Sequence, residues 1–274
     1  MPKEKIEAAK DTPTPKKEKI IPVKEEETLI APEEIKEAPK IEIDVAAWKP
    51  KTSLGKRVKN NEIVDIEHLL DSGATILEPE IIDILLPGME SDLLLIGQSK
   101  GKFGGGQRRV FRQTQKKTRE GNKPKFATYA VIGNRDGIVG LGYGKSKETV
   151  PAREKAVRNA KINIFKIRRG SGSWESKSDE PHSIPFKVEG KCGSVRLALL
   201  PAPKGTGLCA TPEIAKILAF AGIKDIWTQT RGQTKTRTNL IVACERALKQ
   251  LSITKLPAKT MLHIVDGKAG GKNA

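Results

Sequence analysis

Residues 126–164, which read FATYAVIGNRDGIVGLGYGKSKETVPAREKAVRNAKINI, decide the fold of the region around them. Residues 126–132 have the aromatic and β-branched content of a strand, residues 133–137 supply Asn, Asp and Gly for a tight turn, and residues 138–143 return as a second strand. Pro151 then opens a helix with apolar residues on one side and basic residues on the other. This order predicts a small α+β domain.

Positive charge is concentrated around this stretch. The chain has 274 residues and carries 50 Lys and Arg against 33 Asp and Glu, a formal net charge of +17. Residues 100–170 alone hold 20 basic and 4 acidic side chains. Charge of one sign at this density repels itself unless an external anion screens it. A solvated face is the ordinary interpretation of a charge run, but this block exceeds what solubility needs, and we expect nucleic acid as the partner.

The cysteine spacing and the length of the apolar runs argue against a disulfide-stabilised, a zinc-binding and a membrane-spanning protein. Cys192, Cys209 and Cys244 include no C-x-x-C pair, so the sequence encodes neither a disulfide framework nor a cysteine zinc site. The N-terminus lacks the apolar core of a signal peptide, and no later apolar run approaches the ~18 residues that span a bilayer. We therefore expect a cytoplasmic protein with no membrane contact, no metal and no other cofactor.

The segments before this domain differ in character. Residues 1–45 are rich in proline and in charges of both signs, which predicts a disordered tail. Residues 46–97 are expected to form a helical extension, with one helix over about 61–71 and a short second helix bracketed by Pro79 and Pro87-Gly88. Residues 97–125 contain ten basic residues and six glycines, which indicates an exposed basic loop or ribbon.

A second unit follows a Gly- and Ser-rich boundary near residues 170–184. Its predicted elements are strands over 186–189 and 195–200, a helix from Pro212, a strand over 226–230 and a helix over 239–251. We expect an α+β chain with one domain over 98–170, an α/β domain over 181–252 and a C-terminal tail over 253–274.

Two glycine-rich stretches invite an enzymatic interpretation. Residues 140–146 end in Gly-Lys-Ser as a phosphate loop does, but Val139 stands where that loop needs its first glycine. Residues 203–210, PKGTGLCA, precede a helix and resemble the nucleotide loop of the galactokinase, homoserine kinase and mevalonate kinase superfamily. That motif continues Gly-Leu-Gly-Ser-Ser, which residues 207–211 do not reproduce. The histidines His68, His182 and His263 are isolated, and we nominate no catalytic or metal-binding residue.

Long motifs carry a family resemblance. They are TYAVIGNRDGIVGLGYGKSKETVPAREKAVRNAKINI (128–164), RRGSGSWE (168–175), PHSIPFKVEGKCGSVRLALLPAPKGTGLCA (181–210) and AGIKDIWTQTRGQTKTRTN (221–239). With them, the chain from about Trp48 to Leu251 resembles the S-five family of small ribosomal subunit proteins, in its archaeal and eukaryotic form. The resemblance implies a double-stranded-RNA-binding-like fold for the first domain and an α/β two-layer sandwich for the second.

The resemblance also implies a role and a binding surface. Members of this family sit on small-subunit ribosomal RNA near the decoding region and the place where messenger RNA enters, beside S-four and S-eight type proteins, and are associated with assembly and translational accuracy. Contact with messenger RNA is a further expectation. Carried over by position, the expected RNA-binding residues are Lys116, Lys117, Arg119, Lys123, Lys125, Asn134, Arg135, Lys145, Lys147, Arg158, Arg168 and Arg169.

Two departures and two alternatives accompany this prediction. Several archaeal relatives carry cysteines where this chain has Ser171, Ser176 and Ser178, so a metal site in that loop is not expected here. The tail and the Gly/Arg segment over 100–113 extend beyond the matched motifs. The alternatives are a free RNA-binding or assembly factor with the same folds, and a metabolite kinase of the superfamily named above.

Overall fold

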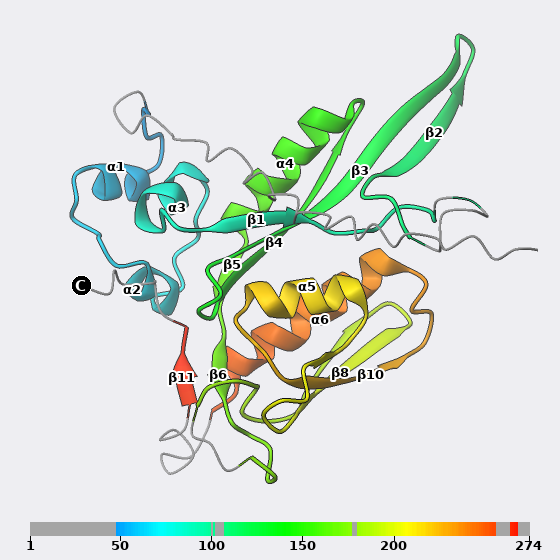
Figure 1. The fold of residues 1–274 in the computed structure, drawn as a ribbon. Helices are drawn as coiled ribbons and strands as arrows, with labels where there is room; N and C mark the ends of the chain where they lie inside the picture. Colours follow the sequence, from blue (N-terminus) through cyan, green and yellow to red (C-terminus); the bar gives the residue numbers. More distant parts are fainter. Residues whose placement is uncertain (1–47, 100, 102–106, 177–179, 256–263, 268–274) are drawn as a thin grey trace, which may run out of the picture. The chain divides into compact units, whose positions relative to one another are not determined.

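The computed structural model describes residues 48–99, 101, 107–176, 180–255 and 264–267. These residues belong to one compact unit within Ile43–Ala274, whereas the unit Met1–Glu42 lies outside the described residues, as does the predicted tail over 1–45. The described part is a mixed α/β fold with two principal sheets (Figure 1). No helix among these residues is long and apolar enough to cross a membrane.

The first sheet is antiparallel and is built around the predicted hairpin. Its strands are β1 (Glu90–Leu93), β2 (Arg112–Thr118), β3 (Gly121–Gly133), β4 (Ile138–Ser146) and β5 (Ile164–Lys166), in the order β1-β3-β4-β5 with β2 paired to β3. In the β3–β4 turn, Asn134 Oδ1 accepts hydrogen bonds from the backbone N–H groups of Asp136 and Ile138. The predicted strands and turn are thus confirmed.

Over residues 112–125, the basic segment before this hairpin is a two-stranded ribbon. Strand β3 begins at Gly121, five residues before the predicted start, because its outer half pairs with β2 from Arg112↔Ala127 to Thr118↔Gly121. Figure 1 shows β2 and this half of β3 projecting together beyond the rest of the sheet. The polar residues of the ribbon are exposed on both sides, so apolar periodicity could not identify these strands.

One face of the hairpin is covered by the predicted helix, α4 (Thr149–Ile162). Glycines at alternate positions of β4 let the helix backbone approach this face closely. A Cβ atom built on Gly142 would lie 2.1 Å from Ala160 N, and one on Gly144 would lie 2.2 Å from Ala152 O. The glycines of residues 140–146 therefore serve helix packing and form no phosphate loop.

The N-terminal region contains α1 (Ser53–Lys59), α2 (Ile66–Asp71) and α3 (Glu80–Leu85). The prediction of one helix over 61–71 was wrong in its first half, because Asn61 adopts a left-handed backbone with φ of 58° and residues 63–65 are not helical. Helix α1 was not predicted. The second predicted helix is confirmed as α3, but β1, which lies within the expected helical extension, pairs with β3.

The second sheet has the order β7-β8-β10-β9. Its strands are β7 (Val188–Cys192), β8 (Val195–Pro201), β9 (Leu208–Cys209) and β10 (Ile226–Arg231), and its helices are α5 (Pro212–Phe220) and α6 (Arg237–Ile253). The predicted strand over 186–189 begins two residues later and ends three residues later, and the other predicted elements of this unit are confirmed within two residues. Strand β9 was not predicted.

The two sheets share one hydrophobic core. It joins residues of the first sheet, such as Val131 and Leu141, to residues of the second unit, such as Leu197 and Leu248. A small third sheet pairs β6 (Arg168–Gly170) with β11 (Ile264–Asp266). The described part of the predicted C-terminal tail thus contributes a strand that pairs beside the expected domain boundary.

Candidate RNA interface

Five cationic side chains lie on one face of strands β2, β3 and β4, and a sixth, Lys147, directly follows β4. Side chains alternate between the faces of a strand, and residues paired across strands share a face. The pairing Arg112↔Ala127 and Ala127↔Lys145 therefore places Arg112 and Lys145 on the same face. Alternate positions along β2 and β3 add Lys116, Lys123 and Lys125, and Lys147 lines the same depression as Lys125 and Lys145. We call this set the basic face: Arg112, Lys116, Lys123, Lys125, Lys145 and Lys147.

The cations of the basic face have few acidic neighbours. Lys116 pairs directly with Lys123 across β2 and β3, an arrangement in which like charges oppose each other. Within the described residues, Lys123 alone of the six has an ion pair, with Glu120 at 2.6 Å, and both of those side chains are largely exposed. The remaining positive charge has no acidic partner in the described part of the chain and can be balanced by an external polyanion.

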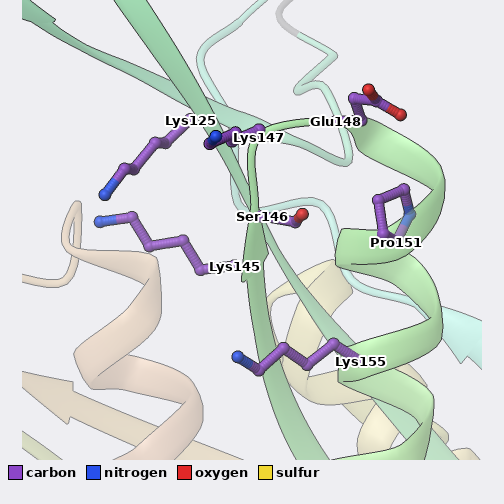
Figure 2. A pocket seen from close by; sticks show the side chains of 7 residues that line it. All are labelled: Lys125, Lys145, Ser146, Lys147, Glu148, Pro151 and Lys155. Atoms are coloured by element: carbon purple, nitrogen blue, oxygen red, sulfur yellow. The ribbon is translucent and has the colours of Figure 1, made fainter.

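The basic face borders an open depression of about 670 Å³. Its lining includes Lys125, Lys145 and Lys147 of the basic face, together with Ser146, Glu148, Pro151 and Lys155. In Figure 2, Lys125 and Lys145 extend to the same side of β4, whereas Ser146 points to the side of α4. Lys155 reaches from α4 past the edge of β4, which β5 covers only over residues 138–140. Four lysines therefore line one shallow surface.

Two tyrosines continue the basic face toward the core. Tyr129 and Tyr143 are directly opposite each other on β3 and β4, with ring centroids 5.1 Å apart and planes tilted by 49°. Burial, followed by the nearby Glu245 carboxylate, raises the pKa of Tyr129 to about 12, so its hydroxyl stays protonated at neutral pH. Tyr143 is 41% exposed.

The structure separates the twelve predicted RNA-binding residues into groups. Five of them, Lys116, Lys123, Lys125, Lys145 and Lys147, belong to the basic face. Lys117 points to the opposite side of the ribbon, Arg119 lies in the turn between β2 and β3, and Arg158 is exposed on α4.

The remaining four predicted residues lie where the two sheets meet. Asn134 holds the β3–β4 turn, and Arg135 pairs with Glu90 at 2.7 Å. Arg168 pairs with Asp266 at 3.1 Å, and Arg169, only 8% exposed, pairs with Asp136 at 2.6 Å. These side chains are engaged within the fold and are separate from the basic face.

Sequence reasoning missed two cations at this surface. Arg112 stands four residues before Lys116, which is the spacing that places two strand residues on one face. This spacing indicates a shared face only if the segment is a strand, and the sequence did not show that it is. Lys155 was recognised on the basic side of its helix, but nothing in the sequence showed that this side borders β4.

The kinase-like glycine loop is filled by the protein's own carboxylate. Asp225, 4% exposed, accepts hydrogen bonds from the backbone N–H groups of Gly205 and Gly207 at Oδ1, at 3.1 and 2.8 Å. A nucleotide phosphate would need these same donors. Among the described residues, no group of three or more His, Cys, Asp or Glu side chains is placed to hold a metal ion.

Comparison with known proteins assigns the chain to a family. The family model described as ribosomal protein S5, N-terminal domain, matches residues 110–168, and that of the C-terminal domain matches residues 190–259. Small ribosomal subunit protein uS5 of Nanoarchaeum equitans is 48% identical over 210 residues, which is 77% of this chain and 90% of the relative. The chain belongs to the ribosomal protein S5 family.

Other archaeal relatives extend the same match. The uS5 protein of Methanocaldococcus jannaschii is 43% identical over 227 residues, 82% of this chain and 98% of the relative, and that of Pyrobaculum islandicum is 44% identical over 214 residues, 78% and 98%. The N-terminal S5 match over 110–168 includes all six cations of the basic face. The surface defined by the strand register therefore lies inside a recognised S5 domain.

Proposed function

We propose that this chain is a structural constituent of the small ribosomal subunit and that its basic face binds small-subunit ribosomal RNA. The observation that carries the proposal is the register of β2, β3 and β4, which gathers five cations on one open face beside Lys147, with a single ion pair among the described residues. Lysine and arginine side chains on exposed strands bind phosphate oxygens without selecting a base sequence. The relatives named above are small ribosomal subunit proteins.

The role is structural rather than enzymatic. The S5 family is not a family of enzymes. The one glycine loop that resembles a nucleotide site uses its two backbone N–H donors to bind Asp225, which supports the same conclusion from the chemistry of the chain.

The proposal also covers the type of RNA-binding fold, the location of the protein and its neighbours. The antiparallel sheet backed by α4 supports a double-stranded-RNA-binding-like interpretation of the first domain, in which shape and phosphate spacing are recognised. We place the protein in the cytoplasm, near the decoding region and the place where messenger RNA enters, beside S-four and S-eight type proteins, with roles in assembly and accuracy. Messenger RNA is a further partner in this proposal.

Sedimentation of a cell extract tests the role. A tagged copy of the full chain, expressed in an archaeal host, should co-sediment with small subunits in a sucrose gradient and remain there after a wash at moderate salt. A free RNA-binding protein or a metabolite kinase would stay near the top of the gradient. An assembly factor would sediment with immature particles only and be absent from subunits engaged in translation.

A further inference from the structure

Tyr143 is an aromatic side chain held in a fixed position on the basic face. It lies two residues from Lys145 along β4, a separation of roughly 7 Å on the same face. On the other face, Gly142 and Gly144 are pressed against the backbone of α4, and Asn159 Nδ2 donates a hydrogen bond to the Tyr143 carbonyl at 2.7 Å. The backbone that carries this ring is therefore constrained from behind.

The ring of Tyr143 is also supported from the side. Tyr129, directly opposite on β3, is half-buried and packs against the shared core, and its ring centroid lies 5.1 Å from that of Tyr143. Tyr143 is the exposed member of the pair, at 41%. In the described strands β2, β3 and β4 these are the only two aromatic side chains on the basic face. A rigid aromatic surface thus stands at the inner end of a row of cations.

This combination matches the chemistry of an unpaired nucleotide. A base that is not stacked in a helix offers a π-face to an aromatic ring, and its flanking phosphates need cations within side-chain reach. Lys145 and Lys125 extend to the same side of β4, and strand alternation places Tyr143 on the face that carries Lys145. Bases inside a duplex are already stacked and cannot use the ring, so the surface selects an unpaired nucleotide in an overhang, a bulge or a single strand.

We propose that Tyr143 is a stacking platform for one unpaired RNA base, with Lys145 and Lys125 binding the adjacent phosphates. The inference rests on the proposed RNA-binding function and adds the kind of nucleotide that the inner end of the basic face accepts. Stacking on an aromatic side chain tolerates any base, so this site recognises an unpaired nucleotide and not a sequence.

The test compares two RNA probes by fluorescence anisotropy at one salt concentration. One probe is a blunt-ended RNA duplex of two strands with no unpaired nucleotide, and the other is the same duplex with a five-nucleotide uridine-rich 3′ extension that carries one 2-aminopurine. The proteins are the full chain and its variants Tyr143→Ala, Tyr143→Leu and Tyr143→Phe, with the double variant Lys125→Ala/Lys145→Ala as the reference for the basic face. Tyr143→Leu keeps apolar bulk beside Tyr129, and circular dichroism verifies the fold of each variant.

The inference predicts that Tyr143→Ala and Tyr143→Leu weaken binding of the extended probe at least about fivefold and leave the blunt probe unchanged. Tyr143→Phe should bind like the original chain and should quench 2-aminopurine, whereas the Ala and Leu variants should not. Equal losses on both probes, or no loss on either, would overturn the stacking role. If the lysine variant also bound both probes normally, the proposed RNA interface itself would be wrong, so the two failures are distinguishable.

Discussion

Asp225 shows how one buried carboxylate fixes a turn. It binds two backbone N–H groups, those of Gly205 and Gly207, whose positive φ angles of 91° and 74° suit glycine. Removing the carboxylate leaves both donors without this acceptor. We expect Asp225→Ala to lower the free energy of unfolding by about 2 kcal/mol, measured by urea denaturation.

A surface carboxylate provides the control for this variant. Glu62 forms an exposed pair with Arg57, so Glu62→Ala should change the free energy of unfolding by less than about 0.5 kcal/mol. A loss for Asp225→Ala as small as the loss for Glu62→Ala would contradict the role given to Asp225.

Lys125 and Lys145 carry the proposed RNA contact most directly, because both line the depression and neither has an ion pair in the described chain. The double variant Lys125→Ala/Lys145→Ala should weaken binding of structured RNA by about 25-fold, or about fivefold for each lysine. Far-ultraviolet circular dichroism should be unchanged, since both side chains are exposed.

The matched control removes the same charge elsewhere. Lys51 and Lys56 are exposed in the N-terminal region, away from the basic face. If Lys51→Ala/Lys56→Ala weakened RNA binding as much as the basic-face variant does, binding would depend on net charge alone and not on the strand register.

The contact between β4 and α4 depends on the absence of side chains. A Cβ at Gly142 would lie 2.1 Å from Ala160 N and 2.2 Å from Ala156 O, so Gly142→Ala must move the helix away from the sheet. We expect a loss of about 3 kcal/mol in the free energy of unfolding. Gly88→Ala is the control, because a Cβ at Gly88 meets nothing within 4 Å. Equal thermal midpoints for the two variants would show that the helix does not pack as described.

Strands and helices could be predicted where the patterns that define them lie within a short stretch of sequence. Strands β3 and β4 and helix α4 follow from alternation, turn residues and a helical apolar stripe within 40 consecutive residues, and the structure confirms them. Strands β1, β6 and β11 exist because they pair with partners distant in the sequence, and no local pattern encodes that pairing. Helix α1 depends on its Thr52 cap and on tertiary burial of Val58 rather than on a strong stripe.

The residues of the candidate site also divide into those that the sequence predicts and those that only the structure identifies. Lys116, Lys123 and Lys125 were nominated by position from the family resemblance, in a stretch of sequence whose positive charge can be counted without a structure. The face they share, and the inclusion of Arg112, follow only from the β2–β3 register. Conversely, the motif position of Arg169 gave no sign that its side chain is buried against Asp136.

The charge distribution of the whole chain sets how binding responds to salt. Residues 100–170 carry a net charge of +16 out of the total of +17. Affinity for structured RNA should therefore fall steeply as salt rises, with little dependence on sequence. Lys125→Ala/Lys145→Ala/Lys147→Ala should reduce the log-log salt slope by up to about 3, if duplex RNA behaves comparably to duplex DNA. An unchanged slope would mean that these lysines do not neutralise phosphates.

Ultraviolet cross-linking of purified small subunits, followed by mass spectrometry of the peptides, tests most directly whether the basic face lies on ribosomal RNA. Cleavage at glutamate alone releases residues 121–148 as one peptide, which contains Lys123, Lys125, Tyr143, Lys145 and Lys147. We predict nucleotides cross-linked to this peptide and to the preceding one, residues 91–120. Cross-links confined to residues after 148, in particles that contain the protein, would contradict the account.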